Sequence, residues 1–370
     1  MGFVYFGSFS HSATEGIHIC EYDENTGAIT YKKTMASHIN ASHVCINQNI
    51  LMATDEQDMG FVYVFQIDPK TGNLVELERR DTLAVNPSFI TIDEKREYAL
   101  ITHFSVGDIV KLVKKREDGS YINKLVSHDS ATCLYELRED GSLGKLCDVG
   151  YHHKGVSPRS MIHRAYQQAG TNLFAENDLE GSVIYLFYLD DKKGKLVYQS
   201  YFIAGEPADG ARIGVFHPSL PYLYINFQNR DVIAQYNVSN LQDVSLVCEH
   251  KLLKNEIFTN EDSQSEIMFH PEKSILYDFV RGKGYALVYQ VNEETGNLSL
   301  IQKLALHGKD PRSAAFTPNH KEIVVAGHDS NAVYRLLIKE DGRLEELQES
   351  VAMSHPAAVA FYSGKEHLWK

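Results

Sequence analysis

The chain has 370 residues, a hydrophobic fraction of 43% and a net charge of −13. The charge argues against a nucleic-acid partner, because an acidic surface repels phosphate backbones and the sequence has no run rich in Lys and Arg. It contains no apolar stretch long enough to span a membrane and no signal-peptide pattern, so we expect a cytoplasmic protein without membrane contact. Its five cysteines lack a CxxC pair, which favours free thiols over disulfides.

Nearly every element that the sequence predicts is a β-strand. Segments rich in β-branched and aromatic residues, at 60–68, 182–190, 285–292 and 331–339, each end at a turn signal. The turns carry glycines that recur at intervals of 45 to 47 residues, from Gly27 to Gly72 to Gly119 and from Gly296 to Gly342. This period suits the four-stranded blade of a β-propeller, which takes about 40–50 residues.

One interval breaks the period. The step between Gly119 and Gly194 is longer and contains a second turn at Gly141. We therefore predict one blade with an inserted hairpin at about residues 129–150, around Leu134 to Cys147, which would cover the channel or form an interface.

The two ends of the chain complete each other. The N-terminal segment 3–9 resembles the second strand of the other blades, whereas the C-terminal segment 355–362 resembles their first strand. We predict an all-β fold with a single domain at 1–370, a seven-bladed β-propeller in which the C-terminal strand completes the first blade. Such closure removes the two open sheet edges that would otherwise invite aggregation.

The first strands of the blades open with similar motifs, such as "NPSFITID", "GARIGVFHP" and "DPRSAAFTP". Residues at the same place in each motif would form a ring at one mouth of the axial channel. Aligned on the proline-like position, the ring members are Ser42, Ser88, Arg159, Arg212, Glu266, Arg312 and Ala357. Three arginines predict an anion site, because guanidinium groups stay charged and match carboxylate or phosphate oxygens. The alternative is that each arginine pairs with a nearby carboxylate and only ties blades together.

The order of these motifs along almost the whole chain resembles the seven-bladed propeller lactonase family. That family includes a propeller type of 6-phosphogluconolactonase and the fungal carboxymuconate lactonizing enzyme. The resemblance implies a histidine in the opening of the fourth blade, an arginine in the fifth and a glutamate on the strand that follows. Arg212 and Arg312 match arginines of the family, Glu266 matches a Glu-Ile opening, and Asp178 matches a loop aspartate.

Two departures from the family pattern concern proton transfer. Gln228 stands where the glutamate is expected, and the segment "SPRSMI" places Arg159 or Ser160 at the expected histidine. Neither glutamine nor arginine titrates near neutral pH, so other groups must carry protons. Candidates at the ends of second strands are His103, Asp178 and His328, although a residue at a strand end is often a turn or capping residue.

We predict hydrolysis of a small lactone that bears a carboxylate or phosphate, without a metal or cofactor. The catalytic candidates are Arg212, Glu266, His328 and His103, and the substrate-binding candidates are Arg159, Arg312, Ser88, Gln228 and Asp178. An arginine would stabilise the oxyanion, and Glu266 or His328 would activate the water.

Three other functions fit the same sequence. They are an intramolecular lactonising cycloisomerase of the carboxymuconate type, a metal-dependent lactonase, and a catalytically silent propeller that binds an anionic metabolite or protein. The sequence has no GxSxG elbow, HExxH motif, P-loop or GxGxxG turn. A closed ring needs no partner chain, so we expect a monomer or a weak homodimer.

Overall fold

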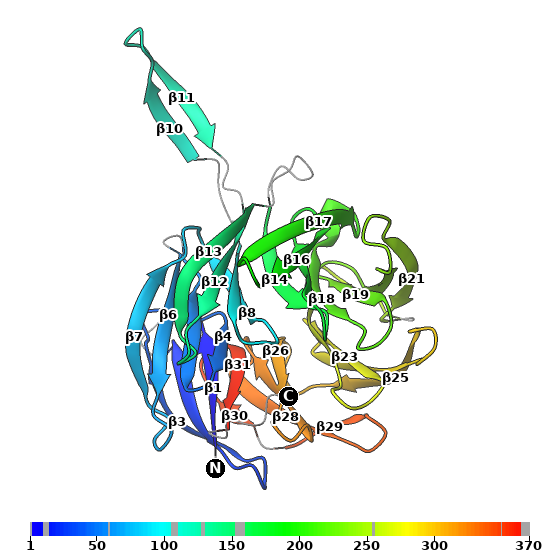
Figure 1. Cartoon of the computed structure of the whole chain (residues 1–370). Coiled ribbons are helices and arrows are strands. Elements are labelled where there is room, and N and C mark those ends of the chain that lie inside the picture. Colours follow the sequence, from blue (N-terminus) through cyan, green and yellow to red (C-terminus); the bar gives the residue numbers. More distant parts are fainter. Residues whose placement is uncertain are drawn as a thin grey trace.

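The strands of the protein are grouped in blades that stand around a central axis (Figure 1). The computed structural model describes residues 2–9, 15–57, 60–104, 110–126, 130–151, 160–253, 256–348 and 350–363. These residues form seven antiparallel sheets of four or five strands, one separate hairpin and a short 3-10 helix, η1 (Pro207–Asp209). The predicted all-β, seven-bladed propeller is confirmed.

The strands of each blade follow one another from the channel outward. Blade 1 consists of β31 (Pro356–Tyr362), β1 (Gly2–Ser8), β2 (Ile17–Tyr22) and β3 (Ile29–Met35). Blade 2 consists of β4 (Val44–Asn47), β5 (Ile50–Asp55), β6 (Phe61–Ile67) and β7 (Leu74–Asp81). Blade 3 consists of β8 (Pro87–Ile92), β9 (Tyr98–His103), β12 (Ala131–Leu137) and β13 (Leu143–Tyr151). Blade 4 consists of β14 (Ile162–Gln167), β15 (Leu173–Asp178), β16 (Val183–Asp190) and β17 (Lys195–Ile203).

The last three blades have the same order. Blade 5 consists of β18 (Ala211–Phe216), β19 (Tyr222–Phe227), β20 (Val232–Asn237) and β21 (Ser245–Lys251). Blade 6 consists of β22 (Ser263–Phe269), β23 (Ile275–Arg281), β24 (Tyr285–Val291) and β25 (Leu298–Ala305). Blade 7 consists of β26 (Pro311–Phe316), β27 (Glu322–Gly327), β28 (Ala332–Ile338), β29 (Leu344–Glu346) and β30 (Val351–Ala352), the last two both pairing with β28.

The two ends of the chain meet in blade 1. β31 pairs antiparallel with β1, from Phe3 opposite Tyr362 to Ser8 opposite Pro356. The C-terminal strand thus supplies the inner strand that the N-terminal segment lacks, as predicted. The ring is held together by main-chain hydrogen bonds between the two ends, and this fixes the diameter of the channel.

The position of a strand within its blade explains its pattern of apolar residues. Second strands such as β5 and β15 are buried at every residue, because adjacent blades cover both of their faces. Outer strands such as β7 and β25 are mostly exposed. The hydrophobic clusters lie between neighbouring blades, and one of them joins Tyr5 of blade 1 to Leu51 and Phe65 of blade 2. This packing holds the inner strands rigidly around the channel.

Tyrosines of the second strands bind the turn glycines of the next blade. Their hydroxyls donate to glycine carbonyls, Tyr5 to Gly72 at 2.8 Å, Tyr224 to Gly296 at 2.5 Å and Tyr277 to Gly342 at 2.9 Å. Gly296 has a φ of +70°, and a Cβ there would lie 2.6 Å from the Tyr224 hydroxyl, so glycine suits both the turn and the contact. The glycine repeat in the sequence therefore marks contacts between blades as well as turns.

The inserted hairpin lies elsewhere than predicted. β10 (Val110–Lys115) and β11 (Tyr121–Val126) pair with each other and stand away from the blades (Figure 1). The segment predicted as the insertion, 129–150, instead contains β12 and β13, and β12 pairs directly with β9. Both segments carry an Asp-Gly turn, so only burial distinguishes them. The first five residues of β12 are buried, whereas Val113 and Tyr121 are 71% and 67% exposed.

The true turn of blade 3 is therefore at Gly141 and not at Gly119. Asn47 of blade 2 donates to the Gly141 carbonyl at 3.2 Å, which is the same kind of blade-to-blade contact that the tyrosines make elsewhere. The even spacing from Gly72 to Gly119 is a coincidence. The inserted β10–β11 hairpin is about as long as the β12–β13 hairpin, so its turn falls where the glycine repeat predicts the turn of blade 3.

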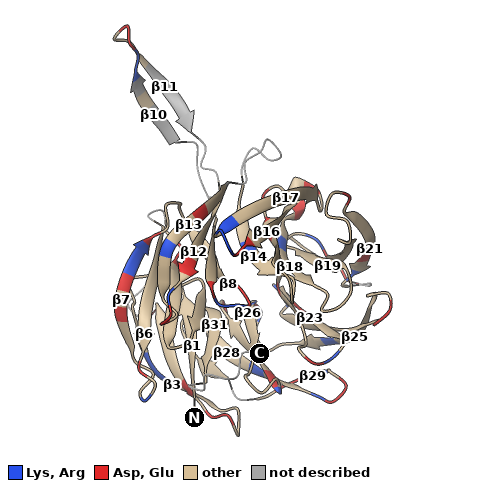
Figure 2. Ribbon diagram, in the orientation of Figure 1, with Lys and Arg blue, Asp and Glu red and all other residues tan. Residues whose placement is uncertain are grey.

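Charged residues of both signs share the outer strands. Figure 2 shows acidic and basic residues side by side along β7, the outer strand of blade 2. Among the described residues, no helix has the length and apolar character needed to cross a lipid bilayer.

Candidate active site

A β-bulge in the inner strands turns one side chain of each affected blade out of the regular alternation. The pairing between first and second strands skips a single residue at the equivalent position in several blades: Ser88, His163, Arg212, Arg312 and Ala357. All of these residues line one cavity in the channel, and Ser42 of blade 2 lines it with them. Five of the seven predicted ring members therefore line one cavity, namely Ser42, Ser88, Arg212, Arg312 and Ala357, and bulges re-aim the last four.

The ring member of blade 4 is His163, which the sequence alignment missed. Ile162 pairs with Asp178 and Arg164 with Asn177, so that His163 is the skipped residue, as Arg212 is in blade 5. The prediction that blade 4 lacks its histidine is wrong. The alignment followed Pro158, but Ile162 takes the place that Pro311 takes in blade 7. Arg159, predicted as a substrate-binding residue, lies outside the described residues.

Glu266 lies one layer deeper than predicted. In blade 6, Gln264 pairs with Val280 and Ile267 with Asp278, which puts Ser265 at the ring position and Glu266 below it. The Glu266 carboxylate accepts a hydrogen bond of 2.5 Å from Nη1 of Arg164, which reaches across from blade 4. The Arg164 guanidinium also lies over the Phe89 ring, with 4.2 Å from Cζ to the ring centroid. Glu266 and Phe89 therefore form the floor of the cavity, and Arg164 lies beneath them, in the pocket at the opposite mouth that it lines together with Glu266.

The second strands supply another set of side chains at the same mouth. They come from the last residue of the strand or the residue directly after it: Phe9, Glu56, Phe104, Leu179, Gln228, Arg281 and His328. Four of these, Glu56, Phe104, Gln228 and Arg281, line the cavity together with the bulge residues. The mouth is thus built from two positions in each blade.

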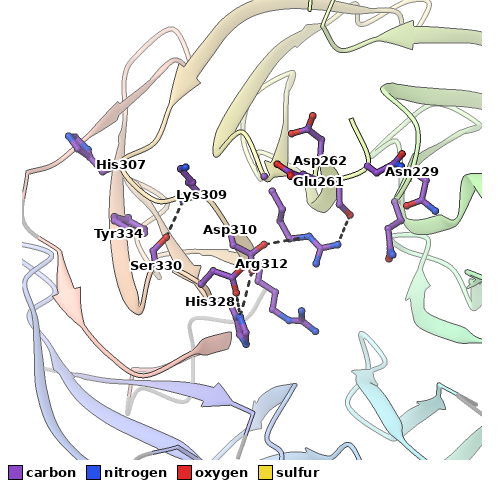
Figure 3. Close-up of a pocket in the computed structure, with 16 residues that line it drawn as sticks. Asn229, Glu261, Asp262, His307, Lys309, Asp310, Arg312, His328, Ser330 and Tyr334 are labelled. Atoms are coloured by element: carbon purple, nitrogen blue, oxygen red, sulfur yellow. Dashed lines mark hydrogen bonds and ion pairs between the residues drawn. The ribbon is translucent and has the colours of Figure 1, made fainter. Parts of the chain in front are cut away.

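The cavity has two parts. The inner part, of about 260 Å³, contains the bulge residues, Glu56, Arg281 and the floor residues Phe89 and Glu266. The outer part, of about 890 Å³, lies over blades 6 and 7 and shares Gln228, Arg281 and Arg312 with the inner one. Figure 3 shows Arg312 and His328 extending from blade 7 into this space.

Arg212 and Arg312 form no ion pair within 4 Å with a carboxylate of the described residues, although Glu266 and Asp310 act on Arg212 from a greater distance. Arg212 is only 7% exposed; its Nη1 donates to the Gln228 amide oxygen at 3.2 Å, and its Nε has no hydrogen-bond partner in the described part of the chain. Burial, together with Arg281 and Arg312, lowers the pKa of Arg212 well below its ordinary value. The Arg312 guanidinium lies over the Phe9 ring, with 4.7 Å from Cζ to the centroid. Neither residue has an ion pair among the described residues.

Arg281 completes the basic cluster and was not among the predicted site residues. Its Nη2 donates to the Ser263 hydroxyl at 2.5 Å, and its Nε lies 3.7 Å from the Asp310 carboxylate. Burial and then Arg312 lower its pKa to about 10. Because Arg312 lowers the pKa of both Arg212 and Arg281, the three guanidinium groups form a cluster whose charge a bound anion would compensate.

Two titratable groups of the inner cavity were also missed by the sequence analysis. Burial, and after it Arg212, lowers the pKa of His163 well below its usual range, so the imidazole is neutral at pH 7. Burial raises the pKa of the Glu56 carboxyl, against a hydrogen bond from Ser42 and the charges of Arg312 and Arg212. The sequence candidates for proton transfer at the end of the second strand came from three blades only. A comparison of this position in all seven blades would have identified Glu56 and Arg281.

Two predicted residues have structural roles instead. His103 is fully buried and binds the Ala131 carbonyl at 2.8 Å and the Thr82 hydroxyl at 2.9 Å, so both of its ring nitrogens are used and a catalytic role is not supported. Oδ1 of Asp178 accepts the backbone N–H groups of Met161 at 2.9 Å and Gly181 at 3.3 Å, which orients the loops of blade 4.

Ser88 and His328 sit at the edges of the site. The Ser88 hydroxyl lies 3.0 Å from the Ile162 carbonyl and 3.1 Å from the His163 carbonyl, so it ties blade 3 to the ring histidine while lining the cavity. His328 lines the outer part, and its Nδ1 binds the Asp329 carboxylate at 2.7 Å. Burial lowers the pKa of His328 although the Asp329 hydrogen bond opposes this.

One group in the outer part has the composition of a metal site. The ligand atoms of Asp310, His328 and Asp329 lie within 4.8 Å of one another. Arg281 shares the Asp310 carboxylate, and Arg312 lines the same pocket, so a cation there would meet two guanidinium groups. Charges of both signs meet in this region, because four carboxylates, those of Glu261, Asp262, Asp310 and Asp329, line the outer part beside Arg281, Lys309 and Arg312.

The fold is a seven-bladed β-propeller, and three arginines line the cavity on its axis. The model of the family described as "Lactonase, 7-bladed beta-propeller" matches residues 3–361, and the chain belongs to that family.

Two 6-phosphogluconolactonases are similar to this chain over almost their full length. The 6-phosphogluconolactonase of Bacillus subtilis is 26% identical over 368 residues, which are 96% of this chain and 97% of the relative. The 6-phosphogluconolactonase of Formosa agariphila is 21% identical over 379 residues, covering 97% of this chain and 99% of the relative. Among solved structures, the periplasmic gluconolactonase PpgL of Pseudomonas aeruginosa has a TM-score of 0.81 at 17% identity, with 98% of this chain and 99% of that chain covered. The last likeness establishes the fold.

Proposed function

We propose that the protein hydrolyses a small anionic sugar lactone in the inner cavity, and that its arginines bind the anion and stabilise the oxyanion. The observation that carries the proposal is the pair Arg212 and Arg312, which line one cavity without an ion pair among the described residues. A structural role for these arginines would require carboxylate partners, such as Glu322 provides for Arg335 elsewhere in the chain.

The substrate class follows from size and charge. A cavity of about 260 Å³ is at the low end for small-molecule sites, and its three guanidinium groups outnumber its two carboxylates, Glu56 and Glu266. The two relatives named 6-phosphogluconolactonase support a phosphorylated six-carbon lactone. We therefore propose a 6-phosphogluconolactone-type substrate whose ring occupies the inner part and whose phosphate binds Arg281 or Arg312 at the boundary with the outer part.

The proposed reaction is attack of water on the lactone carbonyl. Negative charge then develops on the carbonyl oxygen, and Arg212, which is buried and fixed by Gln228, is placed to donate to it. A preorganised donor of this kind in a water-poor site typically contributes about 10²–10³ in rate. His163, kept neutral by burial and the neighbouring guanidinium groups, is placed to hydrogen-bond the substrate without adding charge.

The compartment is part of the proposal. All five cysteines are free, which supports a reducing compartment such as the cytoplasm. Because the Pseudomonas relative is named periplasmic, cell fractionation with an antibody against this chain is the direct test.

The proposed activity is tested by following proton release from glucono-δ-lactone and 6-phosphoglucono-δ-lactone at pH 7, above the spontaneous rate. We expect turnover of both lactones and a higher kcat/KM for the phosphorylated one. A chelator should have no effect, and loss of activity in chelator would support the metal-dependent alternative at Asp310, His328 and Asp329. Thermal stabilisation by 6-phosphogluconate without turnover would show a binding protein and refute the proposed hydrolysis.

A further inference from the structure

Glu56 holds a fixed position at the rim of the inner cavity. It directly follows β5, and its backbone N–H donates to the Asn40 carbonyl at 3.1 Å while the Asn40 side chain donates to the Glu56 carbonyl at 3.2 Å. The Ser42 side chain binds the carboxylate. Hydrogen bonds therefore hold both the backbone and the carboxylate of Glu56. The residue lines the inner cavity together with the bulge residues.

The carboxylate and the arginines face the same space from different blades. Glu56 comes from blade 2, Arg212 from blade 5 and Arg312 from blade 7. Both arginines act on the Glu56 carboxyl electrostatically, yet neither forms an ion pair with it within 4 Å in the described structure. The space between them is the inner cavity. A lactone carbonyl placed there would have guanidinium groups on one side and a carboxylate on the other.

The other titratable groups of the cavity are less suited to accept a proton. The Glu266 carboxylate is engaged by Arg164 at 2.5 Å in the floor. Burial and, after it, the neighbouring guanidinium groups hold the pKa of His163 low, which makes its imidazole a weak base. Gln228 is an amide and does not titrate, and His328 binds Asp329 in the outer part. Of the two carboxylates that line the described cavity, Glu56 is therefore the one without an ion pair among the described residues.

We propose that Glu56 is the general base of the hydrolysis, an inference that rests on the proposed lactonase function. The Glu56 carboxylate takes a proton from water as the water oxygen bonds to the carbonyl carbon, and the carbonyl electron pair moves onto the oxygen held by Arg212. The ring C–O bond then breaks, and the leaving alkoxide takes the proton back from Glu56. The product is a hydroxy acid, which ionises in solution, and Glu56 is again a carboxylate.

The pH dependence follows from the same geometry. The groups around Glu56 in the inner cavity are Arg212, Arg281, Arg312, His43, His163 and Glu266. Burial raises the pKa of Glu56, and the base must be ionised to act, so kcat/KM should fall as the pH falls through a value above that of an ordinary glutamate. Removing the positive charge with Arg312→Gln should move this acidic limb to higher pH.

The test compares Glu56→Gln with wild type on 6-phosphoglucono-δ-lactone. The neutral amide should lower kcat by about 10²–10⁴ and abolish the acidic limb of the pH profile. Binding of 6-phosphogluconate should be equal or tighter, because a negative charge beside the anion is removed. In Glu56→Ala, added formate or azide should restore part of kcat, which a merely structural role would not produce.

Controls separate the possible failures. Glu94→Gln, at the opposite mouth of the channel, should leave kcat unchanged. Glu56→Gln should keep or raise Tm at pH 8, since it replaces a buried carboxylate with an amide of the same shape. If wild type hydrolyses the lactone and Glu56→Gln does so within threefold of it, the general-base assignment is wrong while the lactonase function stands. If wild type shows no turnover above the spontaneous rate, both proposals fall.

Discussion

Two buried arginines of the chain make opposite predictions when each is changed to methionine. Arg212 is 7% exposed and Arg335 is 6% exposed, so the two side chains are shielded from water to the same degree. Arg335 is fully paired, with two hydrogen bonds of 2.8 Å to the Glu322 carboxylate and one of 2.8 Å to the Thr26 carbonyl. Arg212 has one neutral partner, Gln228, and two neighbouring guanidinium groups. Arg335 thus stabilises the fold, whereas for Arg212 we propose a role in ligand binding.

The magnitudes follow from these partners. Arg335→Met leaves Glu322 buried and unpaired, and breaking a buried pair in this way costs about 3–5 kcal/mol. With an unfolding entropy of roughly 2.1 cal/mol/K per residue over 370 residues, that cost lowers Tm by about 4–6 °C. Arg212→Met removes an uncompensated charge, so Tm should stay equal or rise. Its kcat should fall by about 10²–10³, since an oxyanion donor is lost.

The assay is differential scanning calorimetry of both variants beside wild type, together with lactone turnover at a temperature where all three are folded. We expect the two effects to separate, with stability lost in Arg335→Met and activity lost in Arg212→Met. If Arg212→Met lowers Tm as much as Arg335→Met does, Arg212 belongs to the scaffold and the reasoning about the site is refuted.

Three further predictions concern the scaffold. Burial lowers the pKa of His103 from 6.5 to about 4. The neutral imidazole therefore contributes its full stabilisation above pH 6.5, and roughly 3 kcal/mol of the free energy of unfolding is lost as the pH falls to 4. Urea denaturation of His103→Gln should give a flatter dependence of stability on pH in this range. Arg164→Met should lower the free energy of unfolding by about 3 kcal/mol, because it leaves Glu266 without its partner. The double variant with Glu266→Gln should recover most of this loss, whereas additive losses would mean that Arg164 and Glu266 are not coupled. Replacing residues 110–126 with a short Gly-Ser link should change neither Tm by more than about 2 °C nor kcat, because β9 pairs directly with β12; a collapse of stability would contradict that topology.

The fold could be predicted because its signals repeat. The period of the turn glycines and the complementary ends of the chain each reflect contacts made many times around the ring, as between Tyr277 and Gly342. The inserted hairpin was misplaced because its turn has the same chemistry as a blade turn. Only the burial of β12, which depends on the neighbouring blades, distinguishes the two hairpins.

The site could be predicted where the opening motif was aligned in the correct register, as at Arg212 and Arg312. Arg312 follows Pro311 at the bulge and was found, but His163 follows Ile162 and was missed. Register cannot be derived from an opening motif alone, since a shift of one residue changes which side chain a bulge re-aims. Glu56 was missed for a different reason. It directly follows a second strand, and its place beside the arginines depends on how distant blades close the ring.

The central claim is that guanidinium groups from separate blades bind one small anion on the axis of the ring. Titration calorimetry of the stable product 6-phosphogluconate against wild type, Arg212→Met and Arg312→Met measures this directly. Because a hydrogen bond to a charged group contributes about 1.5–3 kcal/mol, we expect each variant to bind roughly 10- to 150-fold more weakly than wild type. Equal dissociation constants for the three proteins would contradict the claim.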